Sequence, residues 1–128
     1  MPVDYINSLK TARMQLTADD YDAGAGPGTI EILTAGYAEV LLIYTLDNPC
    51  GTVAGDPAAL NFSGMPKSAN GLAGGVAALG RIKDSNGVIR ASGFTVTAVG
   101  GSGNFQITST AVQAGQIVDL TSGQIIHG

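Results

Sequence analysis

The stretch Phe94-Thr95-Val96-Thr97-Ala98-Val99 indicates the fold class, because apolar and polar residues alternate along it with a period of two. This period is typical of a β-strand with one buried face and one solvent face. The alternation breaks at residues 100–103 and resumes over residues 105–108. We expect the buried face to carry Phe94, Val96, Phe105, Ile107, Val118 and Leu120. We expect the solvent face to carry Thr95, Thr97, Gln106, Thr108 and Asp119.

Other short apolar runs separated by turn residues lie on both sides of this stretch. They cover residues 29–34, 39–46, 60–62, 76–83, 88–92, 116–120 and 124–126. A spacing of about 8–12 residues between runs predicts a mainly β chain, an antiparallel β-sandwich or barrel of about eight short strands. The absence of interleaved helical patterns disfavours a parallel sheet.

Two of these segments carry further information. Asn86-Gly87 is the strongest hairpin signal in the chain. Residues 39–46 are almost continuously apolar, which predicts a central strand covered on both faces within its own domain.

The N-terminal segment has a different period. Residues 3–22 predict one helix, started by Pro2 or Asp4, with apolar side chains at spacings of three, four and seven. This apolar stripe is narrow, so the helix needs a surface to lie on, either a neighbouring subunit or its own sandwich. The three aspartates near its end predict a solvated terminus or an acidic contact surface: Asp19, Asp20 and Asp22.

A Gly/Pro-rich segment follows the helix and divides the chain. We expect residues 1–28 to form an N-terminal helical arm with a hinge, and residues 29–128 to form the β-sandwich domain. The hinge residues are Gly24, Gly26, Pro27 and Gly28. A phosphate-binding loop is disfavoured here, because such a loop follows a strand and opens a helix, and this order is reversed.

Composition restricts the classes of function. The chain has 128 residues, of which 45% are hydrophobic and 12% charged, as in a single globular domain. The net charge of −4 argues against binding to a nucleic-acid backbone. The sequence has no apolar run of about 18 residues, which argues against a membrane span. With no export signal, we expect the chain to be made in the cytoplasm.

Candidate chemistry is sparse. Cys50 is the single cysteine, so we expect a small, partly buried thiol with no disulfide or zinc framework. The single histidine, His127, lies in a terminal segment where a catalytic orientation is hard to maintain. Paired carboxylates are the one catalytic arrangement that the sequence leaves open. We therefore expect no catalytic residue, no metal and no cofactor, and a role that is not enzymatic.

Several segments spread over nearly the whole chain resemble small structural proteins of tailed-bacteriophage virions. They are residues 2–14, 22–32, 45–49, 66–69, 78–87, 114–116 and 126–128. The resemblance implies a virion location, with synthesis in the bacterial host cytoplasm. The size, the β body and the N-terminal arm are similar to those of capsid decoration (cement) proteins, which bind the outer head surface and stabilise the shell.

The partners implied by this resemblance are the major capsid protein or other virion subunits, together with further copies of the chain. We expect the assembly contacts to come from the helix, through Ile6, Leu9, Arg13 and Leu16. One alternative is a tail or head–tail joining component. Another is a carbohydrate-binding β-module of a host-recognition fibre, against which the absence of Trp counts, because such modules usually present aromatic platforms.

Overall fold

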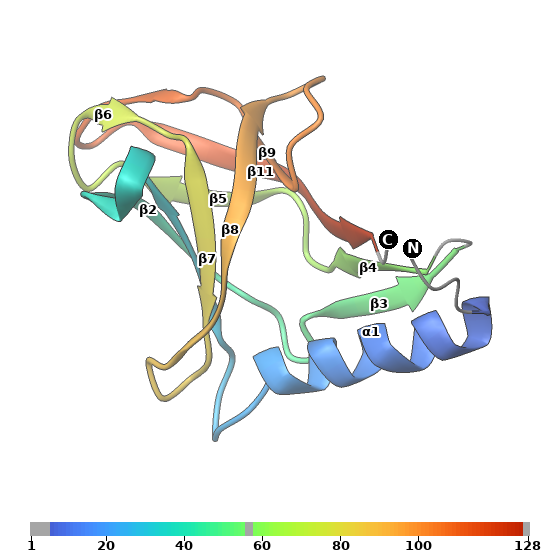
Figure 1. Ribbon diagram of the computed structural model, residues 1–128. Helices are drawn as coiled ribbons and strands as arrows, with labels where there is room; N and C mark the ends of the chain where they lie inside the picture. The colour runs from blue at the N-terminus through green and yellow to red at the C-terminus, as the bar shows by residue number, and fades with distance from the viewer. Residues whose placement is uncertain (1–5, 56–57, 127–128) are drawn as a thin grey trace.

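The computed structural model describes residues 6–55 and 58–126 (Figure 1). In these residues one α-helix, α1 (Asn7–Tyr21), precedes the strands, and a short 3-10 helix (Ala35–Tyr37) lies between the first two. The strands are β1 (Thr29–Leu33), β2 (Val40–Thr45), β3 (Gly51–Ala54), β4 (Ala59–Phe62), β5 (Lys67–Asn70), β6 (Gly75–Val76), β7 (Leu79–Lys83), β8 (Ile89–Ala98), β9 (Phe105–Ile107), β10 (Ala111–Val112) and β11 (Ile117–Ile126). The mainly β fold with an N-terminal helix is confirmed.

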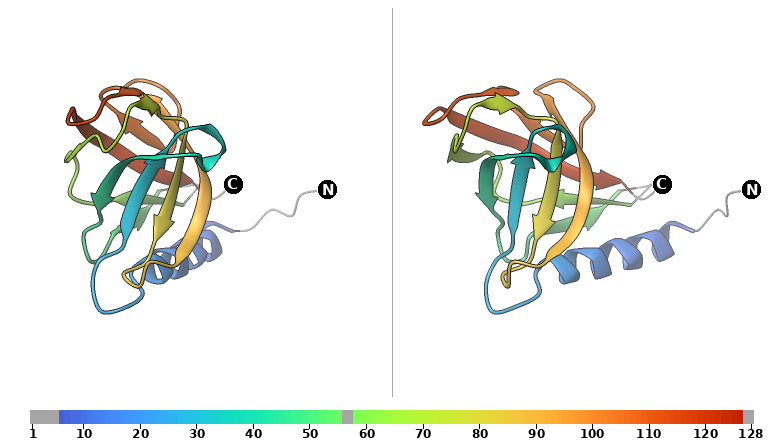
Figure 2. Two further views of the ribbon diagram at one scale, coloured as in Figure 1. Left: turned by 90° about the vertical axis from the view of Figure 1, so that its left-hand side faces the viewer. Right: turned by 60° about the vertical axis from the view of Figure 1, so that its left-hand side comes forward.

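The main sheet curls into a barrel-like body (Figure 2). Its strand order is β2-β1-β7-β8-β9-β11-β4-β3, and β5 pairs with the first part of β11. Beyond β5 the chain returns to β2, where the Leu72 N–H donates to the Leu41 carbonyl at 2.8 Å. The hairpin β3–β4 extends from the barrel, and α1 lies beside it (Figure 1).

One strand pair departs from the expected antiparallel arrangement. β8 and β9 are parallel, with Val96 opposite Phe105, although only residues 99–104 connect them. The loop folds back along β8, where the Gly103 N–H donates to the Thr97 hydroxyl oxygen at 3.1 Å. A parallel pair usually requires a long crossover. Here one tight turn, closed by the Gly101 N–H donating to the Ala98 carbonyl, and a bent glycine-rich loop replace it.

The side-chain directions predicted from the alternation are confirmed on the core side. All six expected core residues are buried, with Phe105, Ile107, Val118 and Leu120 fully so. Of the expected solvent-facing residues, Thr95 and Thr108 are exposed, and the others are half-buried. For β2 the prediction of cover on both faces is wrong, because Ile43 is 42% exposed and Thr45 is also exposed.

The structure has more strands than the sequence pattern predicts. β3 lies in a stretch whose glycines and prolines are typical of turns, and β5 is short and polar, yet each pairs in register with a neighbouring strand. Conversely, β8 and β11 each join two segments that we expected to be separate strands. Register shifts between β7 and β8 allow β8 to continue past its local irregularities.

The ring of Phe105 lies between two glycines in the barrel core. A Cβ atom on Gly80 would lie 2.9 Å from Phe105 Cδ2, and one on Gly123 would lie 3.0 Å from Phe105 Cδ1. Neither contact is tolerable without a shift of the ring. Both positions therefore favour glycine, which has no side chain.

Replacing Gly80 by alanine therefore tests this packing. We expect Gly80→Ala to lower the free energy of unfolding by about 1–3 kcal/mol, because the added methyl group overpacks the core. Gly74→Ala is the matched control, since its Cβ would lie 3.9 Å from the nearest atom, and it should change stability by less than about 0.5 kcal/mol. Urea-unfolding midpoints measure both, and equal midpoints would contradict the packing described.

Candidate assembly site

Three of the four predicted assembly residues lie along one side of α1, because the spacings of four and three align Leu9, Arg13 and Leu16. Ile6 is the extended residue just before the helix, and we name the four together the exposed stripe. Ile6 is 74% exposed, Leu9 39% and Leu16 70%. Arg13 is also exposed. The structure thus brings the predicted residues together, and their contact with another subunit stays a prediction.

A different face of α1 packs against its own domain. Met14, Ala18 and Tyr21 are buried and belong to the same hydrophobic cluster as the barrel core. The Tyr21 ring stacks on Phe62 of β4 with centroids 6.4 Å apart. Burial, aided by the nearby Asp20 carboxylate, raises the pKa of Tyr21 to about 12. Of the two surfaces considered for the helix, its own domain therefore covers this face.

The first turn of α1 is fixed by Asn7. Its Nδ2 donates to the Gly55 carbonyl, and its Oδ1 accepts from the Ala58 N–H, both at 2.9 Å. This side chain thus links the helix to both ends of the loop between β3 and β4. The predicted start at Pro2 or Asp4 lies outside the described residues, and the described helix begins at Asn7 without a side-chain cap.

The last turn of α1 is fixed through Cys50. The Asp22 carboxylate accepts from the Cys50 N–H at 3.0 and 3.2 Å, and the thiol donates to the Ala18 carbonyl at 3.7 Å. Cys50 is fully buried, whereas the sequence predicts a partly buried thiol. Burial, reinforced by Asp22, raises the pKa of the thiol to about 12. This is the environment of a structural thiol, because a reactive cysteine needs a lowered pKa and access.

The glycine-rich segment after the helix is held against the hairpin between β7 and β8. Ser85 donates from both its hydroxyl and its backbone N–H to the Ala23 carbonyl, at 3.1 and 3.4 Å. Gly24 has a φ of +99°, and a Cβ there would overlap the Ser85 hydroxyl. A Cβ on Gly28 would lie 2.5 Å from the Lys83 carbonyl oxygen. The close approach of Ser85 and Lys83 explains why glycine occupies these two positions. Movement of the segment as a hinge stays a prediction.

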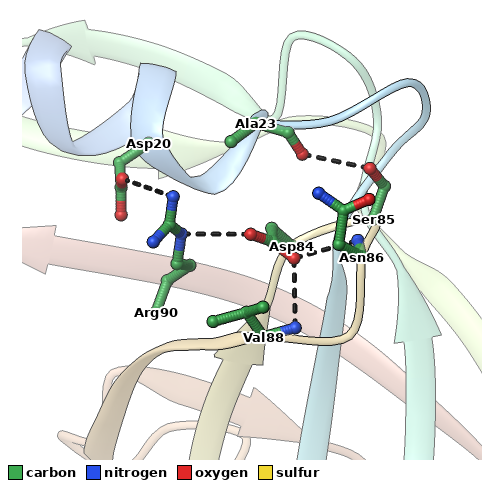
Figure 3. Close-up of polar contacts among 7 residues, drawn as sticks. All are labelled: Asp20, Ala23, Asp84, Ser85, Asn86, Val88 and Arg90. Atoms are coloured by element: carbon green, nitrogen blue, oxygen red, sulfur yellow. Dashed lines mark hydrogen bonds and ion pairs between the residues drawn. The ribbon is translucent and has the colours of Figure 1, made fainter.

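Arg90 joins the same hairpin to the helix, as Figure 3 shows. Its guanidinium contacts Asp20 of α1 at 3.2 Å and Asp84 at 3.1 Å. The side chain of Asp84 is only 3% exposed, and its other oxygen accepts from the backbone N–H groups of Asn86 and Val88. Arg90 lies at a register shift between β7 and β8, where a bulge redirects a side chain. We name Asp20, Asp84 and Arg90 the Arg90 clamp.

The Arg90 clamp changes the interpretation of the acidic helix end. Asp20 is bound by Arg90, and Asp22 is bound by the backbone of Cys50, so both serve contacts within the chain. Asp19 is exposed and accepts from Gln15. Sequence reasoning missed Arg90 because Asp20 is distant in sequence and no local pattern pairs Arg90 with Asp84. Asp84 accepts from two backbone N–H groups of the turn that Asn86-Gly87 predicts, and that turn signal does not indicate the ion pair.

A second surface, absent from the sequence prediction, is a hollow of about 320 Å³ formed by β4, β9, β11 and the loop of residues 99–104. Uncharged hydrogen-bonding side chains dominate its lining, and no charged side chain belongs to it. We name it the amide groove. Its polar residues are Asn61, Asn104, Gln106, Thr121, Ser122 and Gln124.

Two further carboxylates, those of Glu31 and Asp47, face cations. Glu31 contacts Arg81 at 2.6 Å and Lys83 at 3.2 Å, and Asp47 contacts Lys67 at 2.8 Å. Among residues 6–55 and 58–126, no group of three or more His, Cys, Asp or Glu side chains is placed to hold a metal ion. His127 lies outside this part of the chain.

Comparisons with protein-family models, with curated proteins and with solved structures find no match to this chain. No helix in the described part of the chain has the length and apolar character needed to cross a membrane. The function is therefore argued from residues and geometry.

The Arg90 clamp gives a test of how the helix is held. We expect Asp84→Asn to lower the free energy of unfolding by about 1–3 kcal/mol, because it weakens a buried, hydrogen-bonded ion pair. Asp20→Asn removes only a solvent-exposed partner of Arg90 and should cost no more than about 1 kcal/mol. Urea unfolding followed by circular dichroism measures both variants. Equal losses would contradict the assignment of Asp84 as the buried centre of the clamp.

The raised pKa values give a test in alkaline solution. Cys50 and Tyr21 keep their protons in the folded chain at pH values where the unfolded chain releases them, so stability is lost as pH rises above about 9. Each group contributes up to about 1.4 kcal/mol per pH unit in that window. Urea-unfolding midpoints from about pH 8 to about pH 11 measure the decline. Cys50→Ala should show a shallower decline, and an unchanged slope would exclude the thiol as a contributor.

Proposed function

We propose that this chain is a non-enzymatic structural subunit of a tailed-bacteriophage virion, and specifically a capsid decoration protein that binds the outer head surface. The observation that carries the proposal is the exposed stripe on a helix whose other face is fixed to the barrel. The resemblance of the sequence to small virion proteins supplies the setting.

The stripe has the properties of a contact surface. A single exposed apolar side chain is ordinary on a protein, but aligned large ones on one helix side mark an interaction site. Covering Ile6, Leu9 and Leu16 would contribute up to about 1.5–3 kcal/mol for each side chain. Such contacts are individually modest, and an assembly repeats them over many symmetry-related copies.

The partner that fits is an apolar groove on the major capsid protein, on another virion subunit or on a second copy of this chain. A head–tail joining component would use the same stripe to close a ring. The two roles differ in stoichiometry, because a decoration protein covers the whole shell whereas a joining protein forms one ring. Counting copies per particle by cryo-electron microscopy separates them.

The carbohydrate-binding module of a host-recognition fibre receives less support from the aromatic residues. Tyr21 and Tyr44 are buried and Tyr37 is half-buried, so none of the described tyrosines forms an exposed platform. Tyr5 lies outside the described residues.

The proposal predicts a loss of attachment when the stripe becomes charged. The double variant Ile6→Glu, Leu16→Glu should keep its free energy of unfolding within about 0.5 kcal/mol, because both side chains are exposed. It should fail to co-sediment with particles that lack the chain, because burying two carboxylates is unfavourable.

Ser8→Glu is the matched control, since Ser8 is exposed on the other flank of the same helix. This variant should attach as the unmodified chain does. Normal attachment of the double variant would refute the role of the stripe. Failure of both variants would show that added negative charge on the helix, rather than loss of the stripe, abolishes attachment.

A further inference from the structure

The amide groove contains two amide side chains that hold each other and leave part of each open. Asn61 of β4 and Gln124 of β11 are register partners in the sheet. Gln124 Nε2 donates to Asn61 Oδ1 at 2.8 Å. The Asn61 NH₂ group and the side-chain oxygen of Gln124 (Oε1) have no other side-chain partner in the described residues. A donor and an acceptor are therefore presented side by side.

The lining beside this amide pair is already fixed by its own hydrogen bonds. Asn104 accepts from the Thr95 N–H at 3.1 Å and donates to the backbone carbonyl of Gln124 at 3.2 Å. Gln106 accepts from Gly100 and donates to the carbonyl of Gly101, which ties down the loop of residues 99–104. The groove is thus organised before any ligand arrives, which lowers the cost of binding.

The lining restricts the chemistry of a ligand. It has no charged side chain, which disfavours phosphates, nucleotides and other ions. The backbone groups of β4 and β11 pair with each other over residues 59–61 and 124–126, so a peptide cannot add there as a further strand. A vicinal diol both donates and accepts hydrogen bonds, which matches the open groups of Asn61 and Gln124. Met65, which is half-buried, supplies an apolar contact for the C–H face of a sugar ring.

The geometry points to the amide groove as a binding site for neutral oligosaccharides. Its volume of about 320 Å³ lies at the small end of the range of ligand sites. Because the site has hydrogen-bonding groups but no exposed aromatic platform, we expect weak affinity per site. Repetition of the chain in an assembly would raise the avidity. This inference does not rest on attachment to a virion.

The test uses the ¹⁵N-labelled chain and heteronuclear NMR. Neutral trisaccharides (maltotriose, cellotriose, mannotriose and chitotriose) are titrated at millimolar concentration, with the capped peptide acetyl-Ala-Ala-Ala-amide as a non-sugar probe. We expect at least one sugar to shift the amide signals of residues around the groove, and the peptide to shift none. Asn61→Ala and Gln124→Ala should each weaken the sugar titration about tenfold, as the loss of a paired hydrogen-bonding group predicts.

Asn70→Ala is the control, because Asn70 is an exposed amide on β5, another strand that pairs with β11. It should leave the titration unchanged. The proposal is overturned if no trisaccharide shifts the groove signals, or if Asn61→Ala and Gln124→Ala bind sugar as the unmodified chain does. Binding of the capped peptide as strongly as the sugars would also overturn it, since the groove would then be a peptide site.

Discussion

Phe105 lies in the middle of a row of aromatic rings that connects the helix to the barrel. Its ring centroid is 5.1 Å from that of Phe94 and 5.8 Å from that of Phe62, and Phe62 in turn stacks on Tyr21 of α1. The chain has no Trp and only three Phe, and all three belong to this row. These large aromatic side chains therefore join α1, β4, β9 and β8 into one core. The other contacts of the helix add to this connection.

The aromatic row determines which side of α1 faces outward. Once Tyr21 stacks on Phe62, the 3.6-residue period directs Met14 and Ala18 inward and leaves the exposed stripe on the flank. Asn7 at one end of the helix and the Arg90 clamp at the other oppose rotation and lifting of the helix. The sequence predicts a helical arm that needs a surface to lie on, and the described helix is docked on its own domain. A preformed surface loses less conformational entropy when it binds a partner.

Local sequence patterns predict those features of the molecule that depend only on residues near one another in the chain. The alternation around Phe94 and Phe105 predicts the buried face, because side-chain direction in a strand follows directly from position. β5 could not be predicted, since its polar residues form a strand only where β11 offers hydrogen bonds. The same holds for the candidate sites. Helical spacing places Leu9 and Leu16 on one stripe, but no local signal brings Asn61 opposite Gln124 or Arg90 beside Asp20.

The exposed stripe and the open amide pair face different directions. Asn61 and Phe62 are consecutive residues of β4, so their side chains point to opposite faces of the sheet. Phe62 stacks on Tyr21 of α1, and Asn61 therefore points away from the helix. A subunit attached through the stripe would leave the Asn61–Gln124 pair uncovered, because α1 and this pair lie on opposite sides of β4. Attachment to a particle and recognition of a soluble ligand are thus sterically compatible in one small domain, and substitutions at the two surfaces should act independently.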